Sequence, residues 1–223
     1  MDRRQGRNAR HRRPGRALQQ ALRWSDARQK VTALGGHPGL DPGSTQRPRS
    51  APRLETERLI LRDFTRDDLD AHAATLGDIE VMRHISAEPL TREDAMRRIF
   101  MAVGQWPVGG IGMWAVERKE DGRLVGHVGF FDMARDMQPN IEGLPEMGWI
   151  FDSCVHGQGI AREACEAALA WLDANRGPIE VPAIISEGND ASMKLAERLG
   201  FMREPDGVYK GEPIAMFRRP ARG

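Results

Sequence analysis

The feature that most constrains this chain is a pair of glycines between a short apolar run and an amphipathic helical pattern. The run is Met147–Phe151, and the helical pattern covers residues 158–175. Its apolar residues recur one or two turns apart on one face, namely Ile160, Ala164, Ala168, Trp171 and Leu172. Gly157 and Gly159 let the backbone turn tightly and expose unpaired N–H groups at the positive end of the helix. Such a junction is suited to bind a phosphate, although a structural turn with nothing bound explains the glycines equally well.

The elements around the junction predict a mixed α/β fold, with helices early and late around a central antiparallel meander. The Asp-Gly turn within Lys119–Arg123 separates two apolar runs and predicts a hairpin. We expect the helix that begins at Thr91 to end at Gly104 and Pro107, followed by a glycine-rich candidate substrate loop over 106–112. The other predicted elements are a strand within 54–64, a helix start at 65–68, hairpin strands at 113–116 and 124–131, a strand at 181–185, a helix at 191–199 and closing strands within 208–217.

Charge divides the chain into two unequal parts. Residues 1–52 hold 12 Lys and Arg against 3 Asp and Glu, so this Arg-rich part is strongly basic and the remainder is acidic. The first part has too little apolar surface to offset the entropy lost on ordering. We therefore expect a disordered extension over 1–52 and one domain over 53–223. A basic arm could bind nucleic acid, but we favour a dispensable extension and do not expect a nucleic-acid partner.

Several function classes are excluded by motifs that the chain lacks. The glycine junction matches neither the dinucleotide fingerprint nor a Walker A loop, because no Gly-Lys-Ser/Thr follows. Cys154 and Cys165 have no C-x-x-C spacing, which favours a reducing compartment and a cytoplasmic location. The histidines show no zinc-binding spacing, so we expect no metal. No run approaches the roughly 18 apolar residues of a spanning helix, so we expect no membrane partner.

A second motif follows the predicted strand over 181–185. Asn189 is a good helix N-cap, and Gly200 is a good residue to end that helix. Capping alone is the simpler interpretation.

Taken together, these motifs resemble the GCN5-related N-acetyltransferases, and more narrowly the branch that contains the ribosomal-protein N-terminal acetyltransferases. The resemblance covers residues 53–218. It is carried by Leu54–Arg62, by Glu146–Ile150, by Gly157–Ala164, and by Asn189-x-x-Ser192 ending in Leu199-Gly200-Phe201. It implies a mixed, mostly antiparallel sheet of six or seven strands flanked by helices, with acetyl-CoA entering where two central strands splay apart.

The resemblance also implies which residues bind acetyl-CoA. The amides around the junction would hold the pyrophosphate, and the strand before it would bind the pantetheine arm and offer an N–H to the thioester oxygen. The implied set is Trp149, Ile150, Phe151, His156, Gly157, Gln158, Gly159, Ile160, Ala161, Arg162 and Asn189. The chain departs from many relatives at His156, where they carry Gln or Arg, and at Ala196, where they carry a tyrosine that protonates the thiolate.

Direct transfer of an acetyl group to an amine needs a neutral amine and hydrogen bonds for the oxyanion, and no covalent enzyme intermediate. Because a thiol of pKa about 8.5 leaves readily, the base matters more than the acid. We expect Glu146 to be the general base through a water, Asn189 to orient the pantetheine or a water, and Ser192 to protonate the sulfur. The alternatives are a surface carboxylate, a helix cap and a solvated hydroxyl.

The predicted function is therefore transfer of acetyl from acetyl-CoA to a primary amine of a small molecule or a protein N-terminus, by a monomer or homodimer. The acceptor itself is not readable, because loops set it in this fold. Two alternatives are a non-catalytic acyl-CoA-binding sensor or scaffold and a nucleic-acid-associated protein acting through the basic arm. Tyr209, the only tyrosine, is expected to be a core aromatic beside a turn, with a substrate-side role as the alternative.

Overall fold

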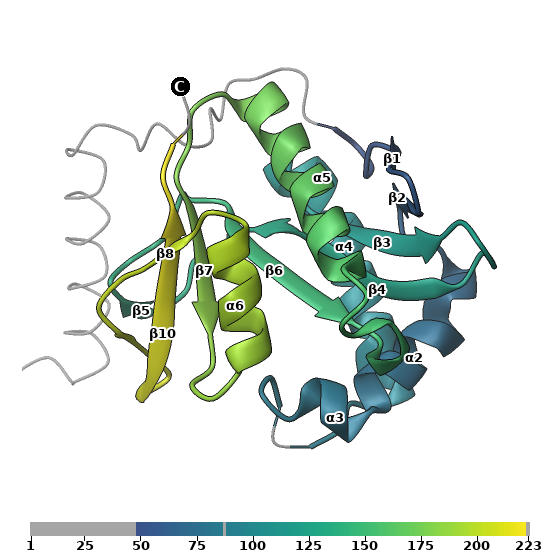
Figure 1. Cartoon of the computed structure of the whole chain (residues 1–223), viewed down its shortest axis with the longest axis horizontal. Helices are drawn as coiled ribbons and strands as arrows, with labels where there is room; N and C mark the ends of the chain where they lie inside the picture. Colours follow the sequence, from purple (N-terminus) through teal and green to yellow (C-terminus); the bar gives the residue numbers. More distant parts are fainter. Residues whose placement is uncertain (1–47, 87, 222–223) are drawn as a thin grey trace, which may run out of the picture. The chain divides into compact units, whose positions relative to one another are not determined.

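Figure 1 shows the computed structural model, which describes residues 48–86 and 88–221. The predicted disordered extension lies outside the described residues over positions 1–47. Residues 48–52 of the extension are described, and the last two contact the domain. The Ala51 N–H donates to Asp63 Oδ1 at 2.9 Å, and the Pro52 carbonyl accepts from the Trp114 indole at 2.7 Å. Ala51 is also buried, so residues 51 and 52 pack with the domain.

Five strands form the first sheet, in the order β1-β2-β3-β4-β6, and each neighbouring pair is antiparallel. Their bounds are β1 Leu54–Glu55, β2 Leu59–Arg62, β3 Met113–Arg118, β4 Leu124–Phe131 and β6 Glu146–Phe151. The predicted hairpin is confirmed as β3 and β4, and Gly122 takes the positive φ of 68° in its turn.

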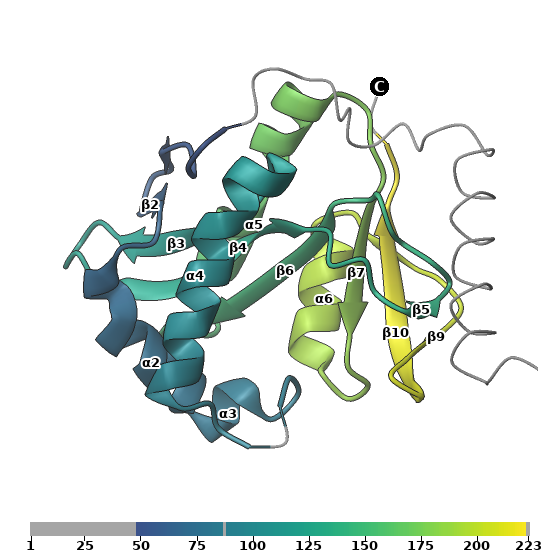
Figure 2. The same ribbon diagram turned by 180° about the vertical axis from the view of Figure 1, so that it is seen from behind.

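A second sheet has the order β5-β9-β10-β7, with β8 also paired to β10. Its strands are β5 Met137–Gln138, β7 Val181–Ile185, β8 Met202–Arg203, β9 Gly207–Tyr209 and β10 Glu212–Arg219. Strand β6 ends the first sheet and β7 ends the second, and within the described chain no ladder joins them. Figures 1 and 2 show the two strands diverging toward their carboxyl ends. The splayed central strands that the resemblance implied are therefore present.

Helices cover both faces of the first sheet. Helices α2 Leu69–Gly77, α3 Ile79–Met82 and α4 Arg92–Gly109 share one apolar cluster with β3 and with Ile150 of β6. Helix α5 Ile160–Arg176 packs in the larger core on the other face, and α6 Asp190–Arg198 lies against β7. Short 3-10 turns stand at η1 Arg66–Asp68 and η2 Ser153–Val155.

The predicted end of the helix that begins after Thr91 is wrong. Helix α4 continues through Gly104 and Pro107 to Gly109, and Gly110 ends it in the left-handed conformation with φ 71°. Proline removes one N–H donor, and its ring strains the preceding turn. Tertiary packing of the last turn outweighs that cost.

Trp106 supplies this packing. It is fully buried, and its ring lies 4.7 Å from Trp114 and 5.4 Å from Trp171, between centroids. Its indole N–H donates to the Met113 carbonyl at 3.3 Å. Most of the proposed substrate loop is therefore the end of a helix, and Trp106 belongs to the core.

Candidate active site

The glycine junction has the backbone geometry of an anion site. Gly157 and Gly159 have φ of 74° and 77°, a region that favours glycine. Gly159 is the N-cap of α5, and the first helical bond runs from the Glu163 N–H to the Gly159 carbonyl at 3.1 Å. The N–H groups of the turn before Glu163 therefore have no acceptor within the helix. A Cβ on Gly157 would meet nothing within 4 Å, so the space beside this glycine is open.

Arg58, the residue before β2, binds to this junction. Its Nε donates to Glu163 Oε2 at 2.6 Å, its backbone N–H to Glu163 Oε1 at 2.9 Å, and its Nη1 to the Gln158 carbonyl at 2.9 Å. Burial acts to raise the pKa of Glu163, but hydrogen bonds from Thr56 and Arg58 outweigh it and lower that pKa. Glu163 thus stays ionised and fixes a guanidinium beside the open N–H groups. Arg58 lies within the Leu54–Arg62 motif, but no local pattern there predicts this role.

The side chains of the junction bond to their own turn. A ring nitrogen of His156 lies 3.0 Å from the Phe151 carbonyl, and Gln158 Nε2 donates to the Cys154 carbonyl at 2.7 Å. Arg162 is exposed and pairs with Glu166 at 2.8 Å, one helical turn on. In this arrangement the junction offers backbone groups more readily than side chains.

The three residues of β6 that were predicted to bind pantetheine differ in which edge of the strand their backbone groups face. A Cβ on Gly126 of β4 would collide with the Ile150 carbonyl, so that carbonyl faces β4. Because backbone groups alternate along an antiparallel strand, those of Trp149 and Phe151 face the opposite edge, toward β7. The Phe151 carbonyl already has a hydrogen-bond partner in the His156 ring. Among the described residues, none pairs with the backbone groups of Trp149, which face away from β4, whereas the backbone groups of Ile150 face β4.

A cavity of about 930 Å³ adjoins this edge. Residues from α2, α4 and α6 and from both sheets line it, including Trp149 and all three predicted catalytic residues, Glu146, Asn189 and Ser192. None of the junction residues 156–162 lines it. The predicted catalytic residues are thus brought together in one space, and the phosphate-type junction lies outside that space.

Glu146 is only 3% exposed, so the alternative of a surface carboxylate is wrong. Arg135 donates to both of its oxygens, from Nε to Oε2 at 2.6 Å and from Nη2 to Oε1 at 3.1 Å. Burial raises the pKa of the Glu146 carboxyl, and the hydrogen bonds and charge of Arg135 oppose that rise. A carboxylate with a raised pKa is a better proton acceptor than a solvated one.

Tyr209 and Phe131 hold Arg135 in place. The Tyr209 hydroxyl accepts from Arg135 Nη1 at 2.8 Å, and the guanidinium carbon lies 4.8 Å from the Tyr209 ring centre and 5.6 Å from that of Phe131. Tyr209 also lines the cavity, so its place fits the substrate-side alternative better than a core aromatic. Arg135 comes from the irregular segment after β4 and stands in none of the sequence motifs.

Asn189 caps α6 as predicted, with Oδ1 accepting from the Ser192 N–H at 3.2 Å. The Ser192 hydroxyl accepts from the Trp149 indole N–H at 3.3 Å. Because its oxygen is the acceptor in that bond, the hydroxyl proton remains available to donate into the cavity. Ser192 is therefore more than a solvated hydroxyl, and Trp149 links it to the free edge of β6.

A family model for the acetyltransferase (GNAT) domain matches residues 58–202. The chain belongs to the GNAT acetyltransferases. This GNAT protein is accordingly an acyltransferase, and acetyl-CoA is the donor typical of its family. The family inferred from the sequence motifs is thereby confirmed.

Individual relatives agree with this placement. The GNAT protein is 30% identical over 159 residues to the uncharacterised N-acetyltransferase YoaA of Bacillus subtilis, which covers 69% of this chain and 84% of YoaA. A Bordetella pertussis protein assigned to the GnaT family superposes with a TM-score of 0.65 at 29% identity, covering 76% of this chain and 99% of that one. RimL, named a ribosomal L7/L12 α-N-protein acetyltransferase and solved with coenzyme A, has a TM-score of 0.61 at 17% identity and covers 76% and 98%. RimL therefore supports the shared fold alone.

The described part of the GNAT domain holds neither a metal cluster nor a membrane span. Within residues 48–86 and 88–221, no group of three or more His, Cys, Asp or Glu side chains is arranged to hold a metal ion. No helix in that part of the chain is long and apolar enough to cross a membrane.

Proposed function

We propose that this GNAT enzyme transfers the acetyl group of acetyl-CoA directly to a primary amine, carried by a small molecule or a protein N-terminus. The observation that carries the proposal is the position of the free edge of β6. This edge lies between the open junction at Gly157–Gly159 and the cavity that contains Glu146 and Ser192. A donor with phosphates at one end and a thioester at the other matches that order of groups.

The donor would be held largely by backbone. The open N–H groups at the start of α5, together with the helix end and the nearby Arg58 guanidinium, suit the pyrophosphate. Along β6, the unpaired backbone of Trp149 suits the amides of the pantetheine arm and the carbonyl oxygen that becomes an oxyanion. Acetyl-CoA supplies the acetyl group there as an activated thioester.

Glu146 is the proposed general base. A protonated amine cannot attack, so a proton must leave the acceptor before or during transfer. The Glu146 oxygens that bind Arg135 keep further lone pairs, which can accept a proton through one water molecule. Arg135 is a positioning residue in this scheme, because it orients the carboxylate and balances its charge.

Ser192 is the proposed acid, and Asn189 orients the pantetheine while it caps α6. The Ser192 proton would go to the departing sulfur as the bond from sulfur to the acetyl carbon breaks. Because a thiolate leaves readily, this proton contributes less than the removal of the amine proton. The two roles therefore differ in weight, and that difference is testable.

The decisive experiment measures free thiol from acetyl-CoA with a panel of primary amines, alongside acetyl-CoA binding by calorimetry. We expect tight binding and thiol release that depends on the amine. Binding without release across the panel would favour the non-catalytic sensor, and absence of binding would contradict both. The nucleic-acid alternative concerns the basic arm, which the structure describes only from residue 48 onward.

We also propose a cytoplasmic enzyme that acts as a monomer or homodimer. Cys154 and Cys165 are both free thiols, as suits a reducing compartment. Sedimentation of the full chain tests its oligomeric state, and fractionation of cells tests its location.

A further inference from the structure

A second group of polar side chains lines the same cavity, on the face of the sheet that α2 and α4 cover. It consists of His72 from α2, Arg98 from α4 and His127 from β4. The two imidazole rings lie 5.1 Å apart between centroids, and the Phe64 ring packs 5.1 Å from His72 and 6.1 Å from His127. None of the three has a part in the transfer steps proposed above.

This group has hydrogen-bonding capacity that nothing in the described chain uses. His72 is 2% exposed and His127 is 8% exposed, yet the buried Nδ1 atom of each has no partner among the described residues. Arg98 is half-buried, and over residues 48–86 and 88–221 it makes no hydrogen bond or ion pair. All three residues line the cavity, and hydrogen-bonding capacity left unused beside a cavity favours a polar ligand there.

The neighbouring carboxylates are already engaged. Asp94 is the carboxylate whose charge acts on Arg98. It accepts hydrogen bonds from Thr91 and pairs with Arg97. Asp68, which interacts with His72, receives two hydrogen bonds from Arg62 at 2.7 and 2.8 Å. The charge of Arg98 is therefore left for a group that enters the cavity.

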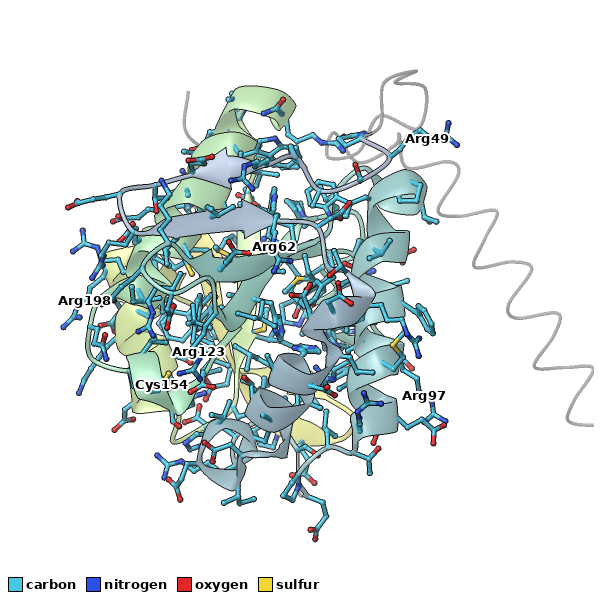
Figure 3. The ribbon with its side chains drawn as sticks, turned by 90° about the vertical axis from the view of Figure 1, so that its right-hand side faces the viewer. Arg49, Arg62, Arg97, Arg123, Cys154 and Arg198 are labelled. Atoms are coloured by element: carbon cyan, nitrogen blue, oxygen red, sulfur yellow. The ribbon has the colours of Figure 1, made fainter. Side chains whose placement is uncertain are left out.

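Arg97 is a useful contrast to Arg98. Arg97 also lines the cavity, but its side chain is 68% exposed and paired with Glu93 and Asp94. Figure 3 shows it on the outer side of α4. Of these two consecutive arginines, only Arg98 contributes to the charge felt by the buried histidines.

The histidines are better suited to bind an anion than to remove a proton. Burial, and then the charge of Arg98, lower the pKa of His72 to about 4. Burial, His72 and Arg98 hold the pKa of His127 well below its usual value of 6.5. Both rings are thus neutral near pH 7 and are weak bases toward an ammonium group. A neutral imidazole still donates one N–H, and two such donors beside a guanidinium match a carboxylate.

The strand register places this group across from the proposed base. His127 pairs with Ile150 and Phe131 pairs with Glu146, so both positions lie on the same face of the sheet. Gly148 stands midway on β6, two residues and about 7 Å from each level. The Phe131 ring covers Gly148 on this face and lines the cavity. An acceptor seated against that ring would therefore have Glu146 on one side and the histidines on the other.

We propose that Arg98, His72 and His127 form a subsite for a carboxylate carried by the amine acceptor. The inference rests on the proposed function, because it assigns the substrate class of that transfer. The carboxylate belongs either to a free amino acid or to an acidic side chain at a peptide N-terminus, and these two sources share the same recognition chemistry.

Matched acceptors test the subsite. One pair is leucine and leucinamide, and the other is glutamyl-alanine amide and glutaminyl-alanine amide, so each pair differs by one carboxylate. We expect the carboxylate member of at least one pair to have a KM about tenfold lower, since charge-assisted hydrogen bonds are strong. The first pair reports a free amino acid and the second a peptide. Equal KM values, or a preference for the neutral member in both pairs, would overturn the proposal.

Variants of Arg98 locate the effect. Arg98→Met should raise the KM of the carboxylate acceptor about tenfold or more and leave kcat and the neutral acceptor little changed, whereas Arg98→Lys should restore part of the loss. Arg92→Met is the matched control, because Arg92 lies on the same helix, is exposed, pairs with Asp70 and does not line the cavity. An equal loss for both members of a pair would show a structural role and contradict the subsite.

A binding measurement separates failure of the subsite from failure of the proposed transfer. Nuclear magnetic resonance of the His72 and His127 ring nitrogens is recorded with CoA present, while N-acetylglycine, N-acetylglutamate or their amides are added. We expect saturable shifts with the carboxylates, none with the amides and none in Arg98→Met. Absence of shifts with both carboxylates would overturn the subsite even if amines are acetylated. Shifts without turnover on any amine would overturn the transfer and leave the subsite standing.

Discussion

The donor side and the acceptor side of this molecule are built in different ways. The donor side consists of consecutive backbone: the free edge of β6, then Gly157 and Gly159, then the first turn of α5. The acceptor side consists of side chains from elements far apart in the sequence, such as Arg135 after β4 and Tyr209 in β9. Backbone sites depend on φ and on chain direction, whereas side-chain sites depend on tertiary packing. Substitutions on the two sides should therefore fail in different measurements.

The largest expected effect is on the acceptor side. Glu146→Gln keeps the shape of the side chain but removes its basicity, so turnover should fall by about a hundredfold, within the usual range for a general base. Acetyl-CoA affinity should be nearly unchanged, because Glu146 lies in the cavity and not at the glycine junction.

The role of Glu146 as a base also predicts how turnover changes with pH, in the natural chain and in Glu146→Gln. Turnover of the natural chain should fall as pH drops toward the raised pKa of Glu146, because the carboxyl then gains a proton and can no longer accept one. The deficit of the variant should shrink as pH rises and free amine accumulates. A pH–rate profile of the same shape in both proteins would show that the base lies elsewhere.

The next largest effect is expected on the donor side, where a substitution at the glycine junction should weaken acetyl-CoA binding. Gly159→Val forces a β-branched residue to adopt φ 77°, which strains the turn that presents the N–H groups. Acetyl-CoA should bind at least about tenfold more weakly by calorimetry, a loss of roughly 1.4 kcal/mol. Its circular dichroism spectrum should match that of the natural chain, because a Cβ there meets only Arg58 Nη2, at 3.5 Å.

Gly104→Ala is a control for the glycine substitution. Gly104 lies inside α4, and a Cβ there would meet nothing within 4 Å. This variant should bind acetyl-CoA normally. Unchanged affinity in Gly159→Val would contradict the assignment of the junction.

The same contrast explains what could be predicted from the sequence. The β3–β4 hairpin, the tight turn at Gly157 and Gly159 and the cap at Asn189 depend on residues close together in the sequence, and all three are confirmed. The sequence carries such features directly, because local conformation limits them.

Two other features depend on contacts between distant segments. Helix α4 passes Pro107 because Trp106 packs against Trp114 and Trp171, which no local pattern shows. Likewise, neither Arg135 nor Arg98 stands in a motif, and each acquires its role only when strands or helices from other parts of the chain face it. Arg135 and Arg98 could not be predicted from the sequence for this physical reason, whereas Glu146 and Ser192 could be, through the motifs that carry the family resemblance.

A smaller effect is expected when the chain is shortened at its N-terminus. It tests whether a loss of domain stability alone changes acetyl-CoA binding. A chain that begins at Arg53 loses the bonds from Ala51 to Asp63 and from Trp114 to Pro52. We expect a loss of about 1 kcal/mol, since water replaces much of each bond, and a thermal midpoint lower by about 3 °C. A chain that begins at Pro48 keeps both bonds and should match the full chain. Acetyl-CoA affinity should be the same in all three proteins, and a loss well above this size in both shortened chains would show that earlier residues support the domain.

The smallest effect concerns the point where the two sides meet. Ser192 receives a hydrogen bond from Trp149 on the donor edge and lines the acceptor cavity. Ser192→Ala removes the proposed acid, but a thiolate leaves readily and water can supply the proton, so turnover should fall only about threefold at neutral pH. The loss should change little with pH, because the Ser192 hydroxyl stays protonated and unassisted departure of the thiolate needs no proton. Single-turnover measurements of thiol release across pH test this directly, with Ser192→Thr as the variant that keeps the hydroxyl. If Ser192→Ala abolishes turnover while Glu146→Gln leaves the pH–rate profile unmoved, departure of the sulfur limits the reaction and the assigned weights of acid and base are reversed.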